Sequence, residues 1–284
     1  EMTELGASAD LVLAADGAGS NLRKAHEAEF GTQLGYGSNH YIWLGSRQIF
    51  ERFLFAFERT EHGHLWLHGY PSSADTSTCI VECTAASWYA HGFDQLSAED
   101  GVRLLEKVFD THLAGHGLIS DSRGEPARWL RFREVTNQSW YHGNVVLLGD
   151  AAHTTHFTIG SGTRLAMIDA ATLAQSLFEQ ADLGAALADY DQRRRSELRR
   201  VQASARTSMA WFENVERYLD RDVTEFAYAL CSRLGQEPAW RYQKYRATQL
   251  PVARAMHRRY ESVGRLYRAC RRGEYSLEAT ATQA

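Results

Sequence analysis

The chain has 284 residues, of which 44% are hydrophobic and 23% are charged, and its formal net charge is −4. This length is enough for one or two domains with a large buried core, and the composition is ordinary for a globular protein. The near-neutral charge gives no support to nucleic-acid binding, and no apolar run approaches the roughly eighteen residues of a membrane span.

The four cysteines do not suggest a disulfide framework. Cys79 and Cys83 lie four residues apart in a strand-like run, which separates them by about 13 Å and is too far for a disulfide bond. No signal-peptide pattern leads the chain. We therefore expect reduced thiols and a cytoplasmic protein.

The first predicted element is a short apolar strand over residues 11–14, which leads into Asp16-Gly17. Turn signals then separate a series of short aromatic or β-branched runs. These runs are residues 41–44, 53–57, 65–69 and 78–83. Serial strands joined by tight loops predict an antiparallel sheet.

A helix is expected over residues 98–114, because apolar residues recur there at helical spacing. Ser97 precedes it as a candidate N-cap, with Asp100 three residues further on. Residues 129–135 are a further predicted strand, which leads the chain back toward Val145.

His62, His64 and His68 lie at even spacing and would share one face of a strand. Such a trio could imitate a metal site, but no carboxylate or cysteine joins it at ligand spacing. We interpret these histidines as surface or pocket residues and predict no metal site.

The most informative segment runs from residue 142 to 174. A buried apolar strand over 145–148 ends at Gly149-Asp150, and a polar loop then leads to Gly160, Gly162 and a helix. In open α/β sheets, ligands bind at the edge where such strands end. The carboxylate can accept hydrogen bonds from a polyol, and the start of the helix can face an electron-poor ring. This description fits a flavin.

The chain is predicted to be helical after Thr163. Its last 95 residues hold about nineteen basic and eleven acidic side chains, with the densest basic cluster at Arg193–Arg195, Arg199 and Arg200. Two interpretations stay open at this point. The arginines lie on solvated helix faces, or they attract an anionic substrate.

The segments ADLVLAADGAGSNLRK and GNVVLLGDAAH, followed by the Gly-rich turn, resemble two flavin-binding motifs of the FAD-dependent aromatic hydroxylases, the single-component flavoprotein monooxygenases. Strings of the middle region, such as NHYIWLG and DTSTCIVE, are similar to the branch of that family that hydroxylates aromatic acyl-CoA thioesters such as salicyloyl-CoA and anthraniloyl-CoA.

The resemblance implies an α/β fold, α+β overall. A Rossmann-like FAD-binding domain in two pieces, 1–35 and 142–205, would hold an inserted antiparallel-sheet substrate domain at 36–141, and 206–284 would be a helical C-terminal region. The GxGxxG segment that opens such domains is missing. We therefore interpret the chain as an N-terminally truncated fragment that retains FAD poorly by itself.

The resemblance also implies which residues contact the flavin. Asp150 would accept hydrogen bonds from its ribityl or ribose hydroxyls, and the helix start would face its pyrimidine edge. Asp16 and Arg23 would support the flavin and the approaching nicotinamide, with a purely structural salt bridge as the alternative. The cofactor-binding set is Asp16, Arg23, Gly149, Asp150, Gly160, Gly162, Thr163 and Arg164.

The implied reaction is hydroxylation of an aromatic ring by O2 through a flavin C4a-hydroperoxide, with NADH or NADPH as reductant. His156 is the candidate for deprotonating a phenol or polarising an amine, and the alternative is a loop histidine packed under the flavin. An aromatic CoA thioester is the expected substrate. Two alternatives remain: hydroxylation of a free indole or phenol such as tryptophan, and a remnant that binds an aromatic ligand without redox chemistry.

Overall fold

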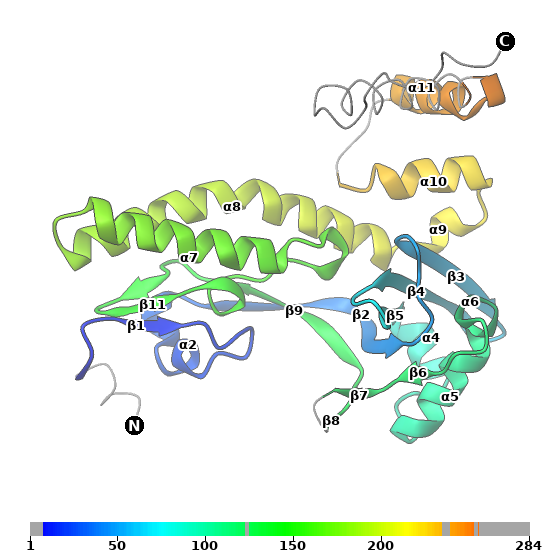
Figure 1. The fold of residues 1–284 in the computed structure, drawn as a ribbon, viewed down its shortest axis with the longest axis horizontal. Coiled ribbons are helices and arrows are strands. Elements are labelled where there is room, and N and C mark those ends of the chain that lie inside the picture. Colours follow the sequence, from blue (N-terminus) through cyan, green and yellow to red (C-terminus); the bar gives the residue numbers. More distant parts are fainter. Residues whose placement is uncertain (1–7, 123–124, 235–238, 253–254, 256–284) are drawn as a thin grey trace, which may run out of the picture. The chain divides into compact units, whose positions relative to one another are not determined.

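The computed structural model describes residues 8–122, 125–234, 239–252 and 255 (Figure 1). The chain forms two compact units, Glu1–Glu216 and Arg217–Ala284. The expected start of the C-terminal region, residue 206, lies inside the long helix α8 (Leu183–Glu213). No helix in the described part of the chain is long and apolar enough to cross a membrane.

A small sheet of three strands contains the two strands that lead into the Asp16 and Asp150 loops. β1 (Val12–Ala14) pairs in parallel with β11 (Val145–Leu147), and β10 (Tyr141–His142) pairs with β11 in the antiparallel sense. All three residues of β11 are buried. This explains why the sequence shows a continuous apolar run there instead of an alternating one.

Two helices cover this sheet and bury its apolar strand. α7 (Gly162–Glu179) and α8 pack against each other and lie along β1 and β11 in Figure 1. Their buried side chains join those of β11 in one core that includes Leu165, Leu187 and Tyr190. The Tyr190 hydroxyl donates a hydrogen bond to the Leu147 carbonyl oxygen at 3.0 Å, which fixes α8 to the strand.

The second sheet is larger and wholly antiparallel, as the sequence predicts. Its strand order is β3-β4-β5-β2-β6, and β9 also pairs with β2. The strands are β2 (Gln33–Ser46), β3 (Leu54–Thr60), β4 (Gly63–Pro71), β5 (Ser77–Cys83), β6 (Leu118–Ile119) and β9 (Leu130–Thr136). β2 is long because its first half pairs with β9 and its second half with β5.

The two faces of the large sheet differ in chemistry. One face buries only apolar side chains at its centre, among them Ile42, Leu67 and Val81. Helix α4 (Ala85–Ala90) packs on this side, where Trp88 stacks on His40 at 4.3 Å. The register places a different set of residues, largely aromatic or polar, on the opposite face. They are Tyr41, Trp43, Phe55, Phe57, Trp66, His68, Ile80 and Glu82.

The helix expected over residues 98–114 consists of two helices. α5 (Ala98–Val108) begins at Ser97, whose hydroxyl accepts a hydrogen bond from the Asp100 amide as predicted. Phe109 ends α5, and α6 (Asp110–Leu113) follows and ends at Ala114 in the left-handed conformation. The apolar spacing persists across this break, so periodicity alone did not reveal it.

The remaining elements are short. In the first unit they are α2 (Asn21–Ala25), α3 (Glu27–Phe30), β7 (Asp121–Ser122), β8 (Glu125–Pro126) and the 3₁₀ turns η1 (Gly149–Ala151) and η2 (Phe157–Ile159). α9 (Glu216–Leu219) spans the boundary between the units. In the second unit, Tyr228 of α10 (Val223–Cys231) contacts Tyr242 and Tyr245 of α11 (Ala239–Gln249).

Candidate functional site

The two motif loops meet at one edge of the small sheet. β1 and β11 run in parallel with Ala14 beside Leu147, so the loops that carry Asp16 and Asp150 start side by side. Arg23 ties them together, because its Nη1 donates to the Ala151 carbonyl oxygen at 2.8 Å across 128 residues of sequence. This edge is the candidate ligand site.

Asp150 lies at this edge with its side chain exposed. The protein around it still removes part of its hydration, so its pKa is raised, and the negative charge of nearby Asp169 adds to the shift. No hydrogen bond from the described residues occupies its carboxylate. The oxygens are therefore available to a hydroxylated ligand.

Two glycines shape the loop around Asp150. Gly149 has a φ of +55°, and a Cβ built there would lie 3.0 Å from the Ala166 Cβ of α7, tighter than most contacts between packed side chains. Gly160 has a φ of +59°, and nothing lies within 4 Å of where its Cβ would be. Gly149 thus permits close packing of α7, whereas Gly160 leaves open space in front of the loop.

The first turn of α7 faces this open space without a capping group. Ser161 precedes the helix and makes no side-chain hydrogen bond to its amides, and the first turn contains no acidic residue. Thr163 and Arg164 are both exposed, next to Gly162. An uncapped helix start with exposed amides and an arginine favours an electron-rich ligand.

Asp16 and Arg23 do not form the buried salt bridge that we considered as an alternative. Burial works against the Asp16 charge, but hydrogen bonds from Ser20 and from the Asn21 amide, at 2.8 Å, lower its pKa. Arg23 is 1% exposed and donates to the carbonyl oxygens of Ala18 and Ala151. Asp16 therefore shapes its own loop, whereas Arg23 connects the two loops.

Three guanidinium groups gather beside the first loop. Arg23 and Arg133 both donate to the Ala18 carbonyl oxygen, at 2.6 and 3.5 Å. Arg131 and Arg133 place their Cζ atoms 5.9 and 5.8 Å from the ring centroid of Tyr36. None of the three forms an ion pair with a carboxylate of the described residues. Positive charge therefore accumulates here. The sequence signal was a pair of arginines two apart on a predicted strand, which share one face.

His156 is buried in the loop between Asp150 and α7. Its Nδ1 lies 2.8 Å from the Thr158 hydroxyl, and its ring stacks on Phe157 at 4.3 Å. Burial lowers its pKa to about 4, partly offset by the negative charge of Glu82. His156 is therefore neutral at physiological pH.

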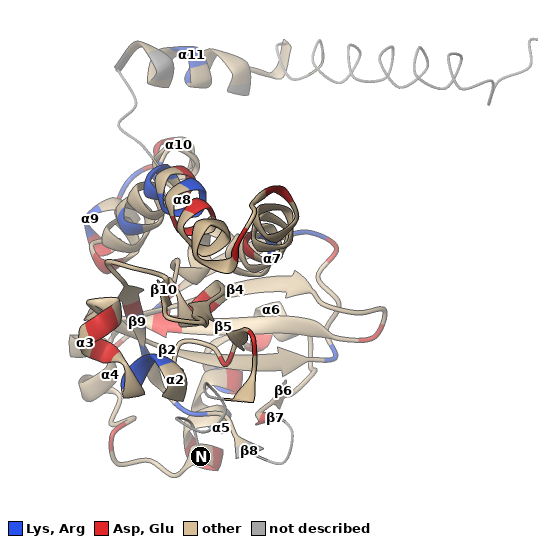
Figure 2. Cartoon of the chain, turned by 90° about the vertical axis from the view of Figure 1, so that its left-hand side faces the viewer, with Lys and Arg blue, Asp and Glu red and all other residues tan. Residues whose placement is uncertain are grey.

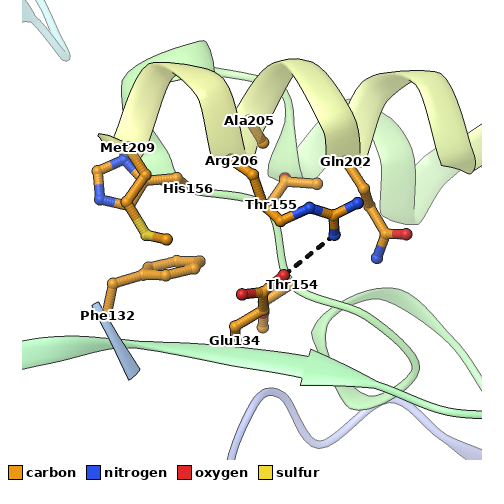
Figure 3. Close-up of a pocket in the computed structure, with 9 residues that line it drawn as sticks. All are labelled: Phe132, Glu134, Thr154, Thr155, His156, Gln202, Ala205, Arg206 and Met209. Carbon is orange, nitrogen blue, oxygen red and sulfur yellow. Dashed lines mark hydrogen bonds and ion pairs between the residues drawn. The ribbon is translucent and has the colours of Figure 1, made fainter. Parts of the chain in front are cut away.

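A small pocket lies behind this loop, between β9 and α8. In Figure 3, His156, Phe132 and Met209 form one end of the pocket. At the other end, Arg206 reaches across to Glu134, with Nη1 and Oε1 3.1 Å apart.

Phe157 connects the loop to the aromatic face of the large sheet. Its ring centroid lies 4.8 Å from Tyr41, 6.3 Å from Trp43 and 5.6 Å from His68. Trp43 is 48% exposed, so part of its indole surface is available to a flat ligand. Phe212 of α8 extends the wall, 5.0 Å from His68.

A buried carboxylate that the sequence reading missed holds the Gly149 turn. Asp169 of α7 is fully buried and accepts hydrogen bonds from the Gly149 amide at 3.0 Å, His153 Nε2 at 2.8 Å and Arg194 Nε at 2.8 Å. Burial works against its charge, but His153 and Arg194 outweigh this effect and lower its pKa. The sequence contained a signal for this residue, because Asp169 lies four residues after Leu165 on the apolar stripe of a predicted helix.

Only part of the basic cluster at Arg193–Arg195, Arg199 and Arg200 lies on a solvated helix face. Arg194 is 2% exposed and paired with Asp169. Figure 2 shows basic and acidic residues side by side along α8. The partners of the two flanking arginines are Glu179 and Asp189 for Arg193, and Asp191 for Arg195. Acids of α7 and α8 thus offset the charge of the first three arginines, whereas Arg199 and Arg200 are exposed.

The three histidines at even spacing also differ from expectation. His62 lies in the turn before β4, and only His64 and His68 are on the strand. Each histidine lies beside a different carboxylate. The distances from the ring nitrogen to the carboxylate oxygen are 3.5 Å for His62 and Glu61, 3.6 Å for His64 and Glu216, and 3.0 Å for His68 and Glu82. They form no common cluster.

A separate group of three side chains brings donor atoms within 4.8 Å of one another near the start of β11. Its members are His26, Glu29 and His142. This is the end of the strand opposite to the Asp150 edge.

Comparison with known proteins gives consistent results. The model of a family described as an FAD binding domain matches residues 3–205. The chain is 38% identical over 235 residues to a salicyloyl-CoA 5-hydroxylase of Streptomyces sp, covering 79% of this chain and 45% of that protein. It is 40% identical over 216 residues to a 3-hydroxy-4-methyl-anthranilyl-[aryl-carrier protein] 5-monooxygenase of Streptosporangium sibiricum, covering 74% and 57%.

The fold is similar to that of PqsL, described as a probable FAD-dependent monooxygenase, from Pseudomonas aeruginosa. The TM-score is 0.55 at 19% identity, over 73% of this chain and 57% of the other. The chain spans about half the length of the curated relatives it matches.

Proposed function

Because this chain belongs to the family of FAD binding domains, we propose that it serves an FAD-dependent hydroxylation of an aromatic ring, with NADH or NADPH as reductant and O2 as co-substrate. The observation that carries the proposal is the course of one loop. It leaves the sheet edge at Asp150 and places Phe157 against Tyr41 and Trp43. The candidate cofactor edge and an aromatic wall are thus joined within one segment.

The residues at the edge fit FAD. The carboxylate of Asp150, which accepts no hydrogen bond from the described residues, suits the ribityl or ribose hydroxyls, and Gly160 faces open space. The uncapped start of α7, with Gly162, Thr163 and Arg164, suits negative charge on the flavin ring. Bound FAD would supply electron transfer from the nicotinamide and activation of O2.

The remaining steps belong to the side chains around the cofactor. Phe157, Tyr41 and Trp43 would orient the substrate ring and exclude water from it. His156, with a pKa of about 4, is poorly matched to act as a base near neutral pH. We therefore favour the role of a packed loop histidine, hydrogen-bonded to Thr158, over that of a proton acceptor.

The guanidinium cluster of Arg23, Arg131 and Arg133 supports the use of a dinucleotide. Guanidinium groups bind phosphate oxygens well, and no carboxylate of the described residues forms an ion pair with this cluster. Arg23 is buried and already bound to two carbonyl oxygens. We propose that Arg131, which is exposed, and Arg133, which is half-buried, receive the phosphates of NADH or NADPH. They take over the anion-attracting role considered first for the C-terminal arginines.

An aromatic thioester is the proposed substrate class. It rests on the relatives named for salicyloyl-CoA and for an anthranilyl group on a carrier protein. The exposed Trp43 indole supports an aromatic ligand, without selecting a thioester. A free indole or phenol is the alternative within the same enzyme class, and aromatic-ligand binding without redox chemistry is the alternative outside it.

The test combines binding with turnover. FAD affinity is measured by the quenching of flavin fluorescence on addition of protein. With FAD present, NADH and NADPH oxidation is then followed with aromatic CoA thioesters, the matching free acids and free indoles, over a range of salt concentrations. Preferential, salt-sensitive use of thioesters supports the proposal. Equal use of free acids without salt dependence favours the free-arene alternative, and no oxidation with any arene favours the non-redox one.

A further inference from the structure

Glu82 is a buried carboxylate on the aromatic face of the large sheet. It lies on β5, between β4 and β2, and is 1% exposed. Three side chains from the neighbouring strands donate to it. Asn39 Nδ2 is 2.8 Å from Oε1, and Trp66 Nε1 and His68 Nε2 are each 3.0 Å from Oε2.

The environment keeps this carboxylate ionised. Burial works against the charge of Glu82, but the hydrogen bond and charge of His68 outweigh burial, with contributions from His156 and Asn39, so its pKa is lowered. An ionised carboxylate only accepts hydrogen bonds. The ring nitrogen of His68 that meets it must therefore carry a proton, which places that proton on Nε2.

The His68 ring in turn contacts three other elements. Its centroid lies 5.2 Å from Phe55 of β3, 5.0 Å from Phe212 of α8 and 5.6 Å from Phe157 in the loop. The contact with Phe157 is edge to face, with an angle of 84° between the rings. The orientation of His68 therefore affects where Phe157 can lie.

We propose that Glu82 is a positioning residue of the aromatic site. By holding His68 with its proton on Nε2 and its ring in one orientation, Glu82 keeps Phe157 against Tyr41 and Trp43. This inference rests on the proposed function, because Phe157 belongs to the candidate flavin loop.

The distribution of polar groups across the sheet argues for a positioning role. A buried charge is costly, and well-packed apolar residues often replace a buried ion pair without loss of stability. The centre of the opposite face of the same sheet is packed with apolar residues such as Leu67 and Val81 and contains no ion pair between described residues. The charged group occurs on the face that meets Phe157, where a fixed orientation matters more than stability.

Glu58 provides a matched control. It lies on β3 of the same sheet, and its Oε1 is 2.6 Å from His112 Nε2, so it forms the same kind of pair. Its register partner is Leu65, which places it on the opposite face, and the pair is partly exposed. Glu58→Gln therefore removes a glutamate–histidine contact without touching the aromatic site.

The first experiment reads the position of the His68 proton directly. Long-range ¹H–¹⁵N spectra of the histidine rings are recorded at neutral pH for the wild type, Glu82→Gln and Glu58→Gln. We expect His68 to carry its proton on Nε2 in the wild type and in Glu58→Gln, and to become a mixture of tautomers in Glu82→Gln. A wild-type His68 protonated on Nδ1 alone would overturn the proposal, and this observation needs no variant to fold.

The second experiment separates positioning from general structure. With FAD added, Glu82→Gln is expected to lower kcat for hydroxylation about tenfold and to raise NAD(P)H consumption without product, while FAD affinity stays within about threefold. Glu58→Gln should match the wild type. An equal loss of FAD affinity and kcat would mean a purely structural role and overturn the proposal. If the wild type binds no FAD even at FAD concentrations high enough to offset weak retention, the proposed function fails, and the tautomer spectra still decide the role of Glu82.

Discussion

The small and the large sheet each depend on one buried carboxylate, and the two carboxylates work differently. Asp169 binds a backbone amide, that of Gly149, together with the charged Arg194. Glu82 binds only side chains, and its one titratable partner is His68. The first fixes the course of the main chain beside the candidate cofactor edge. The second fixes ring orientations on the aromatic face.

This difference has an energetic consequence. Arg194 is always charged, so loss of the Asp169 charge leaves a buried cation without its main partner. Glu82 is held by Asn39, Trp66 and His68, so loss of its charge strands no permanently charged group. We therefore expect the small sheet to respond to substitution mainly in stability and the large sheet mainly in function.

The largest effect is expected for Asp169→Asn. It leaves the guanidinium of Arg194, which is 2% exposed, with only the exposed Glu197 as an ion-pair partner, and should lower the free energy of unfolding by about 3 kcal/mol. Urea unfolding followed by circular dichroism measures this change. Asp189→Asn, which removes a more exposed acid paired with Arg193, is the control. A loss no greater than that of the control would remove the contrast between the two sheets.

The next effect is a pH dependence from His156. Its folded pKa of about 4 lies below the usual value of 6.5. The unfolded chain therefore binds a proton between these values that the folded chain does not. Stability should fall as the pH is lowered through this window, by up to about 1.4 kcal/mol per pH unit.

His156→Gln should remove this part of the slope in unfolding experiments between about pH 6.5 and pH 4. His26→Gln, which replaces a partly exposed histidine, should retain it. Parallel pH profiles for His156→Gln and the wild type would show that His156 is not buried in its neutral form.

A smaller effect, confined to binding, is expected for Asp150→Ala. The side chain is exposed and without hydrogen-bond partners among the described residues, so folding should change little. FAD affinity should fall about tenfold or more, as for the loss of hydrogen bonds to a charged group worth roughly 1.5–3 kcal/mol. Flavin fluorescence titration measures it. Equal affinities would remove Asp150 from the site.

The smallest effect is expected for Arg193→Ala. Its ion pairs with Glu179 and Asp189 are solvent-exposed and contribute little to stability. The unfolding midpoint and the salt dependence of NAD(P)H oxidation should match those of the wild type. Arg133→Gln should reduce that salt dependence, because its guanidinium group lies in the proposed phosphate site. A reversed result would restore the first interpretation of the C-terminal arginines.

The sequence predicted those helices and strands that follow from a pattern within a few neighbouring residues. The strand before Gly149, the capped start of α5 and the antiparallel series each follow from short patterns. Arg194 was misread because α8 looks polar in this region, and only the packing of α7 shows that one of three adjacent arginines points inward. Asp169 was missed because its partners Gly149, His153 and Arg194 lie 16 to 25 residues away in sequence.

The environment of Glu82 depends on strand register. Its partners Asn39 and Trp66 lie 43 and 16 residues away in sequence, and a shift of one residue in either strand would send them to the other face. The charge of Glu82 within the apolar run of β5 could have indicated a special site. It could not have indicated which residues bind Glu82.

The contact between Gly149 and Ala166 limits how this protein can vary over evolutionary time. A methyl group on either side fills the space, since a Cβ at Gly149 would meet that of Ala166 at 3.0 Å. A larger residue at position 166 would push α7 away from the turn, and the positive φ at 149 penalises every replacement of glycine. Position 149 is therefore expected to remain glycine, and residues larger than alanine at position 166 should be rare among functional clones from random mutagenesis.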